Sequence, residues 1–323
     1  MFDVEEKEIS SEEKAQPRGR RLIDRYKKNY AIPSEAPVTE EMVLDHWELE
    51  KNLTEELLAS DSENRWEVFD RCYTELYSQI EWLNRYVDKD DSRDYEVRFS
   101  NWLHVIGEPP QKIYEVGSGK AGLISFLAQR GFECKATEVT IERGQSYADV
   151  IPNLHWGISD GIHLGEFEPA GQYEVVISNQ VIEHLHPDDV RKHFIGSYAI
   201  LKKGGRYIFS VPHQCAGPAD ISSIFGCNEP RGMHLHEYTY GELANICKDA
   251  GFSDISAVLS LPVKVAKMTK GLFKPMPSGL YLHYSQALEN VLLFLPPSGL
   301  RRKMAKLMRL LLFDPCIFMV ATR

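Results

Sequence analysis

Acidic side chains flank a glycine-rich loop in the segment YEVGSGKAGLISFLAQRGFECKATEVT, residues 114–140. Glu115 stands two residues before the first glycine of the loop GSGKAG (117–122), and Glu138 ends the next strand-like run. Glycines at such a turn let the backbone approach a ligand closely, and the helix that follows offers unpaired N–H groups. Carboxylates beside the loop can accept hydrogen bonds from hydroxyl or ammonium groups. The segment therefore predicts a site for a ligand that contains a nucleoside.

The loop alone leaves two cofactor classes open. GSGKAG fits the GxGxxG pattern of dinucleotide-binding proteins, and both classes use an acid such as Glu138 to bind ribose hydroxyls. Glu115 separates them, because a carboxylate there would repel a pyrophosphate but would accept a hydrogen bond from an ammonium group. S-adenosylmethionine carries an ammonium group and no phosphate. Asp160 and Gly161, in SDGIHL after a third strand-like run, add an acid that could accept from an adenine amine.

Histidines supply the candidate catalytic bases. His184 lies four residues beyond Gln180, after the strand-like run 173–179, and His213 follows the run 206–211. Both positions fall at the carboxyl edge of a predicted parallel sheet, where ligands bind in such folds. Neutral imidazole is a suitable base near pH 7. His184 could equally cap the following turn, and for His213 we favour a loop histidine with a structural role.

The segment HLHEY (234–238) alternates polar side chains before a helix. These side chains could line an acceptor pocket, with His236 as a third candidate base, or they could only hold the loop in place. Zinc is the metal that these residue types could in principle bind, through His213, Cys215, Cys227, His234 and His236. The spacing of the two cysteines matches no compact zinc finger, so we predict no metal.

Strand-like and helical segments alternate through the middle of the chain. The strand-like runs cover residues 112–116, 134–139, 154–160, 173–179 and 206–211, and the helical patterns cover 122–130, 142–149 and 187–201. This alternation implies a parallel, doubly wound α/β sheet. A further helix begins at a capping box of Thr239 and Glu242, and two more strand-like runs lie at 255–261 and 316–322.

The N-terminal hundred residues divide into two parts. Residues 1–36 are polar and predict a mostly flexible or loosely docked arm. Residues 37–100 predict a helical extension, with one helix from Thr39 and a second that begins at a capping box of Ser60 and Glu63. Apolar side chains recur at helical spacing in the second helix: Trp66, Phe69, Tyr73, Leu76, Tyr77, Ile80 and Leu83. They could form a lid over the site, but we favour packing into a core.

The chain from about residue 110 to 260 resembles the class I S-adenosylmethionine-dependent methyltransferases, especially the small-molecule, type 11-like branch. The resemblance rests on five ordered motifs: YEVGSGKAG, ATEVT, SDG, NQVIEHL and LKKGGRYIFSVP. One departure is Ala121, which stands where the third loop glycine usually falls. Five motifs in order are far more specific than one glycine loop.

The resemblance implies a Rossmann-like, seven-stranded mixed sheet whose last strand, 316–322, is antiparallel. It implies a methyltransferase domain over residues 101–323, with an insertion at about 262–314. It also implies S-adenosyl-L-methionine as the cofactor. The expected cofactor-binding residues are Glu115, Gly117, Ser118, Gly119, Glu138, Val139, Asp160, Gly161, Asn179 and Gln180.

Charge is distributed unevenly along the 323 residues, whose net charge is -10. Residues 1–100 carry 26 acids and 15 bases, whereas residues 257–323 carry 2 acids and 10 bases. The overall negative charge argues against a nucleic acid as partner. The basic, leucine-rich segment 299–312 could lie on an anionic membrane, although we favour its packing on the sheet.

Features that report on the cellular compartment agree with one another. The six cysteines are scattered without a CxxC pair, which suits a reducing compartment. The acidic N-terminus lacks the apolar stretch of a signal peptide, and no apolar run is long enough to cross a bilayer. We therefore expect a cytoplasmic protein, with contact to the inner membrane face as an option.

The expected function is methyl transfer from S-adenosylmethionine to a hydroxyl of a small molecule, or of a sugar in a glycan or glycolipid precursor. The alternatives are an NAD(P)-dependent oxidoreductase, which the GxGxxG pattern allows, and a non-catalytic nucleoside-binding or scaffold protein. The intact loop and both of its acids argue against the latter.

Overall fold

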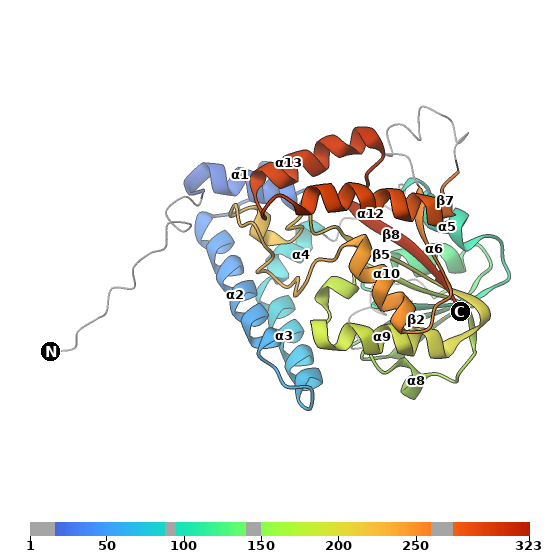
Figure 1. Cartoon of the computed structure of the whole chain (residues 1–323). Coiled ribbons are helices and arrows are strands. Elements are labelled where there is room, and N and C mark those ends of the chain that lie inside the picture. The colour runs from blue at the N-terminus through green and yellow to red at the C-terminus, as the bar shows by residue number, and fades with distance from the viewer. Residues whose placement is uncertain (1–16, 88–94, 140–149, 260–273) are drawn as a thin grey trace.

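An eight-stranded sheet lies at the centre of the computed structural model, which describes residues 17–87, 95–139, 150–259 and 274–323 (Figure 1). Its strand order is β3-β2-β1-β4-β5-β8-β6-β7. The strands are β1 (Lys112–Val116), β2 (Glu133–Glu138), β3 (Leu154–Ile158), β4 (Tyr173–Asn179), β5 (Leu201–Pro212), β6 (Asp254–Leu259), β7 (Met276–Ser278) and β8 (Cys316–Thr322).

The first five strands are parallel, and β8 pairs antiparallel with β5 and with β6. This confirms the doubly wound mixed sheet with an antiparallel last strand. The predicted strand number is one too low, because β7 adds an antiparallel edge strand to β6. Three successive residues of β4, Val175, Val176 and Ile177, are completely buried. Such continuous burial is typical of a parallel strand covered by helices on both faces.

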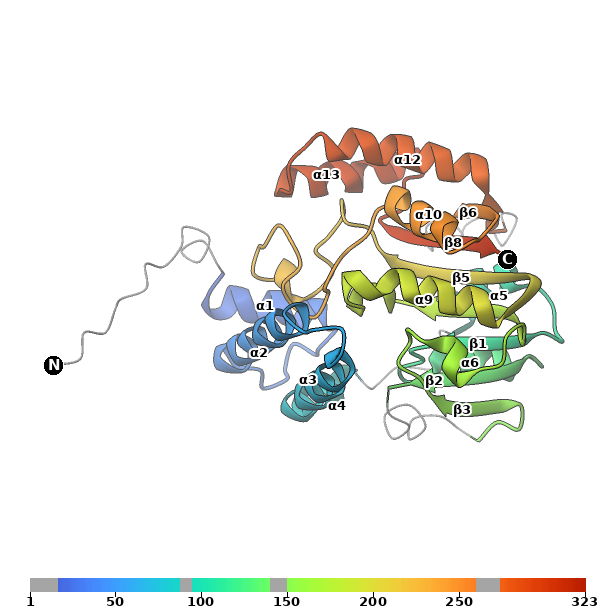
Figure 2. The ribbon, with the colours of Figure 1, turned by 60° about the horizontal axis from the view of Figure 1, so that its bottom comes forward.

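Helices cover the two faces of the sheet (Figure 2). One apolar core lies beneath α5 (Tyr95–Ile106) and α6 (Gly122–Ala128). The other lies beneath α9 (Pro187–Ile200), α10 (Tyr240–Asp249) and α12 (Gly279–Leu293). The short helix α8 (Leu164–Phe167) packs beside α9. The strand order turns back between β1 and β4, which is the position where doubly wound folds form a ligand crevice.

Four N-terminal helices form a separate group beside the sheet (Figure 2). They are α1 (Gly19–Asn29), α2 (Glu40–Leu58), α3 (Arg65–Gln79) and α4 (Glu81–Val87). Their apolar side chains share a third core with the segment 221–235, which contains η4 (Ile221–Ser223). The N-terminal helices are thereby anchored to a loop that follows β5.

The flexible arm predicted for residues 1–36 is wrong for its second half. Leu22 and Tyr26 of α1 are completely buried, and the Tyr26 hydroxyl lies 2.7 Å from Nδ1 of His46 on α2. Polar composition misled the prediction, because two apolar side chains one helical turn apart are enough to dock a short helix on a neighbour. Residues 1–16 lie outside the described residues.

Of the two predicted capping boxes, one is confirmed by the structure and one is wrong. Thr239 and Glu242 form the predicted capping box of α10. The box predicted at Ser60 and Glu63 is wrong, because α3 begins at Arg65. The Ser60 hydroxyl instead donates to the carbonyl oxygen of Leu57 at the end of α2 (2.6 Å). The predicted helix 142–149 lies outside the described residues.

The insertion predicted at 262–314 contains β7, α12, α13 (Gly299–Met308) and η5 (Arg309–Leu311), and residues 260–273 are not described. Helix α12 packs on β6, and α13 packs on α12, with Ala305 and Met308 in the apolar core that also holds side chains of β8. Within the described residues, no helix combines the length and apolarity that crossing a bilayer requires.

Candidate active site

A cleft opens where the carboxyl ends of β1, β2, β3 and β4 meet α3. Its volume is about 900 Å³ with the open mouth included, which suits a nucleoside-sized ligand. Nine of the ten residues predicted to bind cofactor line it: Gly117, Ser118, Gly119, Glu138, Val139, Asp160, Gly161, Asn179 and Gln180. Four strands therefore deliver these side chains to one edge of the sheet.

The loop after β1 has a backbone that glycine favours. Gly117 and Gly119 have φ values of +61° and +53°. A Cβ atom on Gly117 would come within 2.8 Å of Val181 Cγ2, whereas one on Gly119 would meet no atom within 4 Å. Ser118 ties the loop to β2, since its N–H donates to the carbonyl oxygen of Thr137 (2.9 Å). The backbone at Gly119 is thus left open on the side where a ligand can approach.

Ala121 shows how the chain departs from the usual third glycine. It adopts a left-handed conformation (φ +59°) at the N-cap position of α6 and is completely buried. The left-handed backbone conformation costs a residue with a Cβ atom about 1–2 kcal/mol relative to the right-handed one. The left-handed turn before α6 is therefore formed here by alanine.

Glu138 at the end of β2 contacts the loop directly. It accepts hydrogen bonds from the backbone N–H groups of Gly119 and Val139, the latter at 3.2 Å. Burial raises its pKa, and these two amide donors act in the opposite direction. The side chain therefore holds the loop and borders the cleft at the same time.

Asp160 is oriented by its own turn. Its Oδ1 accepts from the N–H groups of Ile162 and His163, both at 2.8 Å, and its Oδ2 lies 2.7 Å from Nδ1 of His163. Gly161 adopts φ +70° in the same turn. These contacts hold an acidic side chain at the cleft wall.

Glu115 lies beneath the loop, and its side chain is only 3% exposed. Among the described residues, its Oε2 has no hydrogen-bond partner. Burial raises the pKa of Glu115 to about 8; hydrogen bonds from Ser118 and the Ile124 N–H oppose this, and the charge of Glu138 adds to it. The proposed contact of Glu115 with an ammonium group stays a prediction.

The raised pKa of Glu115 has a testable consequence for stability. Between about pH 5 and 8 the folded state holds a proton that the unfolded chain has lost, so stability falls as pH rises. One such proton contributes roughly 1 kcal/mol per pH unit. The side chain of Glu115→Gln stays neutral at every pH. The free energy of unfolding of the wild type should therefore fall relative to that of the variant as the pH rises over this range. Urea titrations at several pH values measure the difference, and parallel curves for the two proteins would contradict it.

His184 is the one candidate base that lines the cleft. It ends η3 (Ile182–His184), and its Nδ1 donates to the carbonyl oxygen of Met233 at 2.9 Å. The capping role considered for it belongs to His186, whose Nδ1 accepts from the N–H of Asp188 at the start of α9 (3.2 Å).

The other two candidate bases lie elsewhere. His213 is completely buried, with Nε2 3.0 Å from Glu289 Oε2 on α12 and Nδ1 accepting from the N–H of Cys215. This supports the structural role that we favoured for it. His236 lies 3.3 Å from Glu242 at the first turn of α10. Both histidines are engaged with partners that hold the loops of the domain together.

Three aromatic side chains of α3 form the wall opposite the sheet: Phe69, Tyr73 and Tyr77. The predicted apolar stripe of α3 thus both lines the cleft and packs into the N-terminal core, because Tyr73 belongs to that core as well. Helix α3 is held over the cleft by Arg65, whose Nη1 donates to Asp189 Oδ2 of α9 at 2.6 Å. Both partners of this ion pair are buried.

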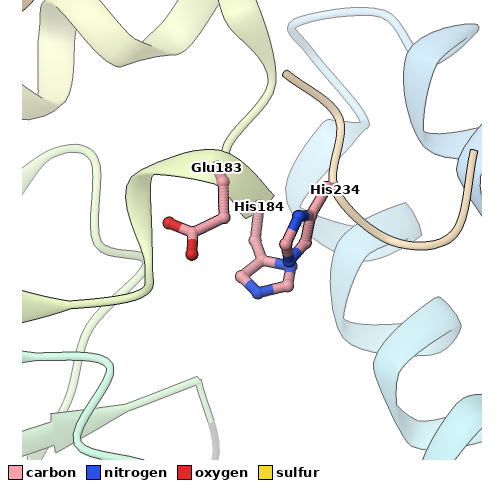
Figure 3. Close-up of side chains that lie close together, drawn as sticks. All are labelled: Glu183, His184 and His234. Atoms are coloured by element: carbon pink, nitrogen blue, oxygen red, sulfur yellow. The ribbon is translucent and has the colours of Figure 1, made fainter. Parts of the chain in front are cut away.

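The side chains weighed for zinc do not gather as that set. Among the described residues, the group of potential metal ligands is instead Glu183, His184 and His234 (Figure 3). Sequence reasoning missed Glu183. Its only signal was its place beside His184 in NQVIEHL, and nothing in the sequence indicates that His234 lies next to both.

Comparison with known proteins decides the family. A sequence profile described as a methyltransferase domain matches residues 83–257, which is more than half of the chain. The chain belongs to this methyltransferase family. The protein is an S-adenosylmethionine-dependent methyltransferase, as its motifs predict. The dinucleotide that the GxGxxG pattern left open is therefore not the cofactor of this enzyme.

Solved structures of similar fold include an S-adenosylmethionine-dependent methyltransferase from Archaeoglobus fulgidus. It is 15% identical, with a TM-score of 0.49, and the match covers 72% of this methyltransferase and 95% of that chain. Another such methyltransferase, from Mesorhizobium loti, is 16% identical with a TM-score of 0.45. The match covers 72% of this chain and 99% of that chain. A search of curated proteins found no match.

Proposed function

We propose that this methyltransferase transfers a methyl group to a hydroxyl of a small molecule, with a sugar of a glycan or glycolipid precursor as the favoured acceptor class. One observation carries the proposal. A single cleft runs from the glycine loop and Glu138 to His184 and the aromatic side chains of α3. A cofactor end and an acceptor end can therefore be occupied together.

The cofactor end fits S-adenosylmethionine. Glu138 would accept from the ribose hydroxyls, Asp160 would accept from the adenine amine, and the open backbone at Gly119 would lie against the amino acid part. When bound, this cofactor supplies a methyl group on a positively charged sulfur. The chain aligns the acceptor with that methyl group and excludes water, which is the main demand of such a displacement.

The acceptor end offers a base. Nδ1 of His184 faces a carbonyl oxygen and must carry its proton, so the lone pair is on Nε2. A neutral imidazole of this tautomer can take the proton of a hydroxyl while the oxygen attacks the methyl carbon. This favours a hydroxyl as the acceptor over a carboxylate, which needs no base.

The aromatic wall favours a ring-shaped acceptor. Phe69, Tyr73 and Tyr77 offer broad apolar faces with two phenolic hydroxyls, a mixture that suits a sugar with its apolar ring faces and polar rim. The same residues would exclude water when the acceptor is bound.

The proposal is tested by transfer of radiolabelled methyl groups from S-adenosylmethionine into extracts of the source organism. The label is expected as a methyl ether on a hydroxyl oxygen of a sugar or another small molecule, and this ether should survive the acid hydrolysis that cleaves a glycan into its sugars. A label found only on nitrogen or carbon would overturn O-methylation. Calorimetric titration with S-adenosylhomocysteine in parallel tests the cofactor end alone.

We further propose that residues 299–312 contact an anionic membrane surface, which would bring the cleft near a lipid-linked acceptor. Leu300, Leu307 and Leu310 are exposed, the last at 80%, and Lys303, Lys306 and Arg309 are exposed among them. Only Arg301, Ala305 and Met308 of α13 are buried within the described structure. Exposed leucines interleaved with basic side chains suit an interface between headgroups and acyl chains.

Vesicle co-sedimentation measures this contact. The enzyme is expected to bind vesicles containing phosphatidylglycerol and to remain in solution with pure phosphatidylcholine. The double substitution Leu307→Glu/Leu310→Glu should abolish binding, because it removes apolar area and adds repulsion from the anionic surface. Leu58→Glu, at an exposed leucine on α2, is the matched control. Equal binding of the double variant and of Leu58→Glu to the anionic vesicles would contradict the proposed membrane contact of residues 299–312.

A further inference from the structure

A buried carboxylate without a partner lies beside the acceptor end of the cleft. Glu183 is completely buried, and within the described part of the chain neither of its carboxylate oxygens has a hydrogen-bond partner. Burying a carboxylate without compensation costs several kcal/mol. An acid in this position therefore indicates a ligand that the carboxylate would hold.

Two imidazoles accompany this carboxylate. One potential ligand atom from each of Glu183, His184 and His234 can be chosen so that all three lie within 4.8 Å of one another. The rings of His184 and His234 meet edge to face, with a centroid separation of 4.9 Å and an interplanar angle of 82°. Figure 3 shows the two imidazoles next to the Glu183 carboxylate. Ligand atoms around a tetrahedral zinc ion lie about 3.3 Å apart, so small side-chain rotations would close the group on an ion.

Both imidazoles are oriented as metal-binding histidines usually are. Nδ1 of His184 donates to the Met233 carbonyl oxygen, and Nδ1 of His234 lies 3.0 Å from Glu237 Oε1. With Nδ1 protonated on each ring, the lone pair is on Nε2. A carbonyl or carboxylate behind the distal nitrogen is the outer contact that fixes the tautomer of a ligating histidine.

The surrounding charge also favours a cation. Glu237 and Asp220 are buried next to His234, at 2% and 8% exposure. Backbone amides satisfy both: Glu237 Oε1 accepts from Ala219, and Asp220 Oδ2 accepts from Gly232. Among the described ion pairs, no Lys or Arg reaches these acids or Glu183. Of these three acids, Glu183 is the one that remains for a ligand.

The backbone holds the three residues in register. The carbonyl oxygen of Glu183 accepts from the N–H groups of Leu235 (2.8 Å) and His236 (3.3 Å), and the N–H of Met233 donates to Thr54 Oγ1 on α2 (2.7 Å). The segment that carries His234 is thus fastened both to η3 and to the N-terminal helices. Such a rigid framework favours a built site over a chance approach of side chains.

We propose that Glu183, His184 and His234 bind a divalent transition-metal ion of the zinc class at the acceptor end of the cleft. Two imidazoles and one carboxylate form a ligand set used by catalytic zinc sites, and imidazoles disfavour Mg²⁺ and Ca²⁺. Three protein ligands leave a coordination position open, and His184 lines the cleft. An acceptor oxygen could take that position, and with its Nε2 on the ion His184 would act as a ligand instead of the base proposed above. The place of the acceptor rests on the proposed O-methylation, whereas the binding site itself does not.

The test uses the full chain after treatment with a chelator. Zn²⁺ is titrated by calorimetry and Co²⁺ by visible absorption, and each is expected to bind with one ion per chain. The Co²⁺ spectrum should lack a thiolate charge-transfer band, because no cysteine belongs to the site. Glu183→Gln and His234→Ala should each weaken binding at least about tenfold. His236→Ala, two residues along the same segment, should bind both ions as the wild type does.

The outcomes separate this inference from the proposed function. Failure of the wild type to bind Zn²⁺ and Co²⁺, or equal binding by Glu183→Gln, would overturn the metal site. Glu183→Gln keeps the shape of the side chain, and circular dichroism checks the fold of each variant. S-adenosylhomocysteine is titrated into the same samples. Binding of S-adenosylhomocysteine without binding of metal would contradict only the metal site. Binding of metal by a protein that transfers no methyl group to oxygen would contradict only the proposed O-methylation.

Discussion

Glu138→Ala is expected to weaken binding of S-adenosylhomocysteine by about 100-fold. Hydrogen bonds to a charged carboxylate contribute about 1.5–3 kcal/mol each, and the cleft places this carboxylate where two ribose hydroxyls would be held. The substitution also removes the acceptor that holds the N–H groups of Gly119 and Val139, so the loop loses part of its order. Isothermal titration calorimetry measures the affinity.

The matched control for this substitution is Glu133→Ala. Glu133 begins the same strand, is exposed, and pairs with Lys112 at 3.4 Å far from the carboxyl edge. Its loss should leave cofactor affinity unchanged, since exposed ion pairs contribute little. Wild-type affinity in Glu138→Ala would defeat the placement of the cofactor at the loop after β1.

His184→Ala is expected to lower kcat about 100-fold or more while the affinity for S-adenosylhomocysteine holds. General base catalysis contributes about 10²–10⁴-fold, and His184 lies at the acceptor end rather than beside the loop. Single-turnover methyl transfer with the acceptor found in extracts measures the rate. His155→Ala, at an exposed position of β3, should keep full activity.

The metal content of His184→Ala separates two roles of this imidazole. A variant that has lost both activity and bound Zn²⁺ identifies His184 as an ion ligand. A variant that keeps the ion and loses activity identifies it as the base. Full turnover in the variant would remove His184 from the mechanism altogether.

Much of the cofactor end was predictable because its residues follow strands. Parallel strands end at one edge of a sheet, so Gly117, Glu138, Asp160 and Asn179 meet there once the alternation of strands and helices is recognised. The strand ends were predicted within two residues for β1, β2, β3 and β4. Local periodicity placed these residues at one edge of the sheet, and the resemblance to the methyltransferase family implied their roles.

Helix starts were predictable only where local chemistry decided them. Thr239 and Glu242 cap α10 as expected. The same pattern at Ser60 failed because that hydroxyl bonds to the end of the preceding helix instead. The burial of α1 also depends on a distant partner, since Tyr26 meets His46 of another helix.

The sequence by itself determined the fold class, the cofactor and the edge of the sheet where the candidate site lies, because these depend on patterns that are short in sequence. Only the tertiary structure decided which histidine reaches the cleft and which carboxylate is left without a partner. His184 and His213 both follow strands, yet His213 is covered by Glu289 from the C-terminal insertion. His234 meets Glu183 and His184 across 50 residues of intervening chain, because backbone hydrogen bonds to the Glu183 carbonyl bring its segment back to η3. Contacts of this kind arise from packing between distant segments, for which the sequence carries no periodic signal.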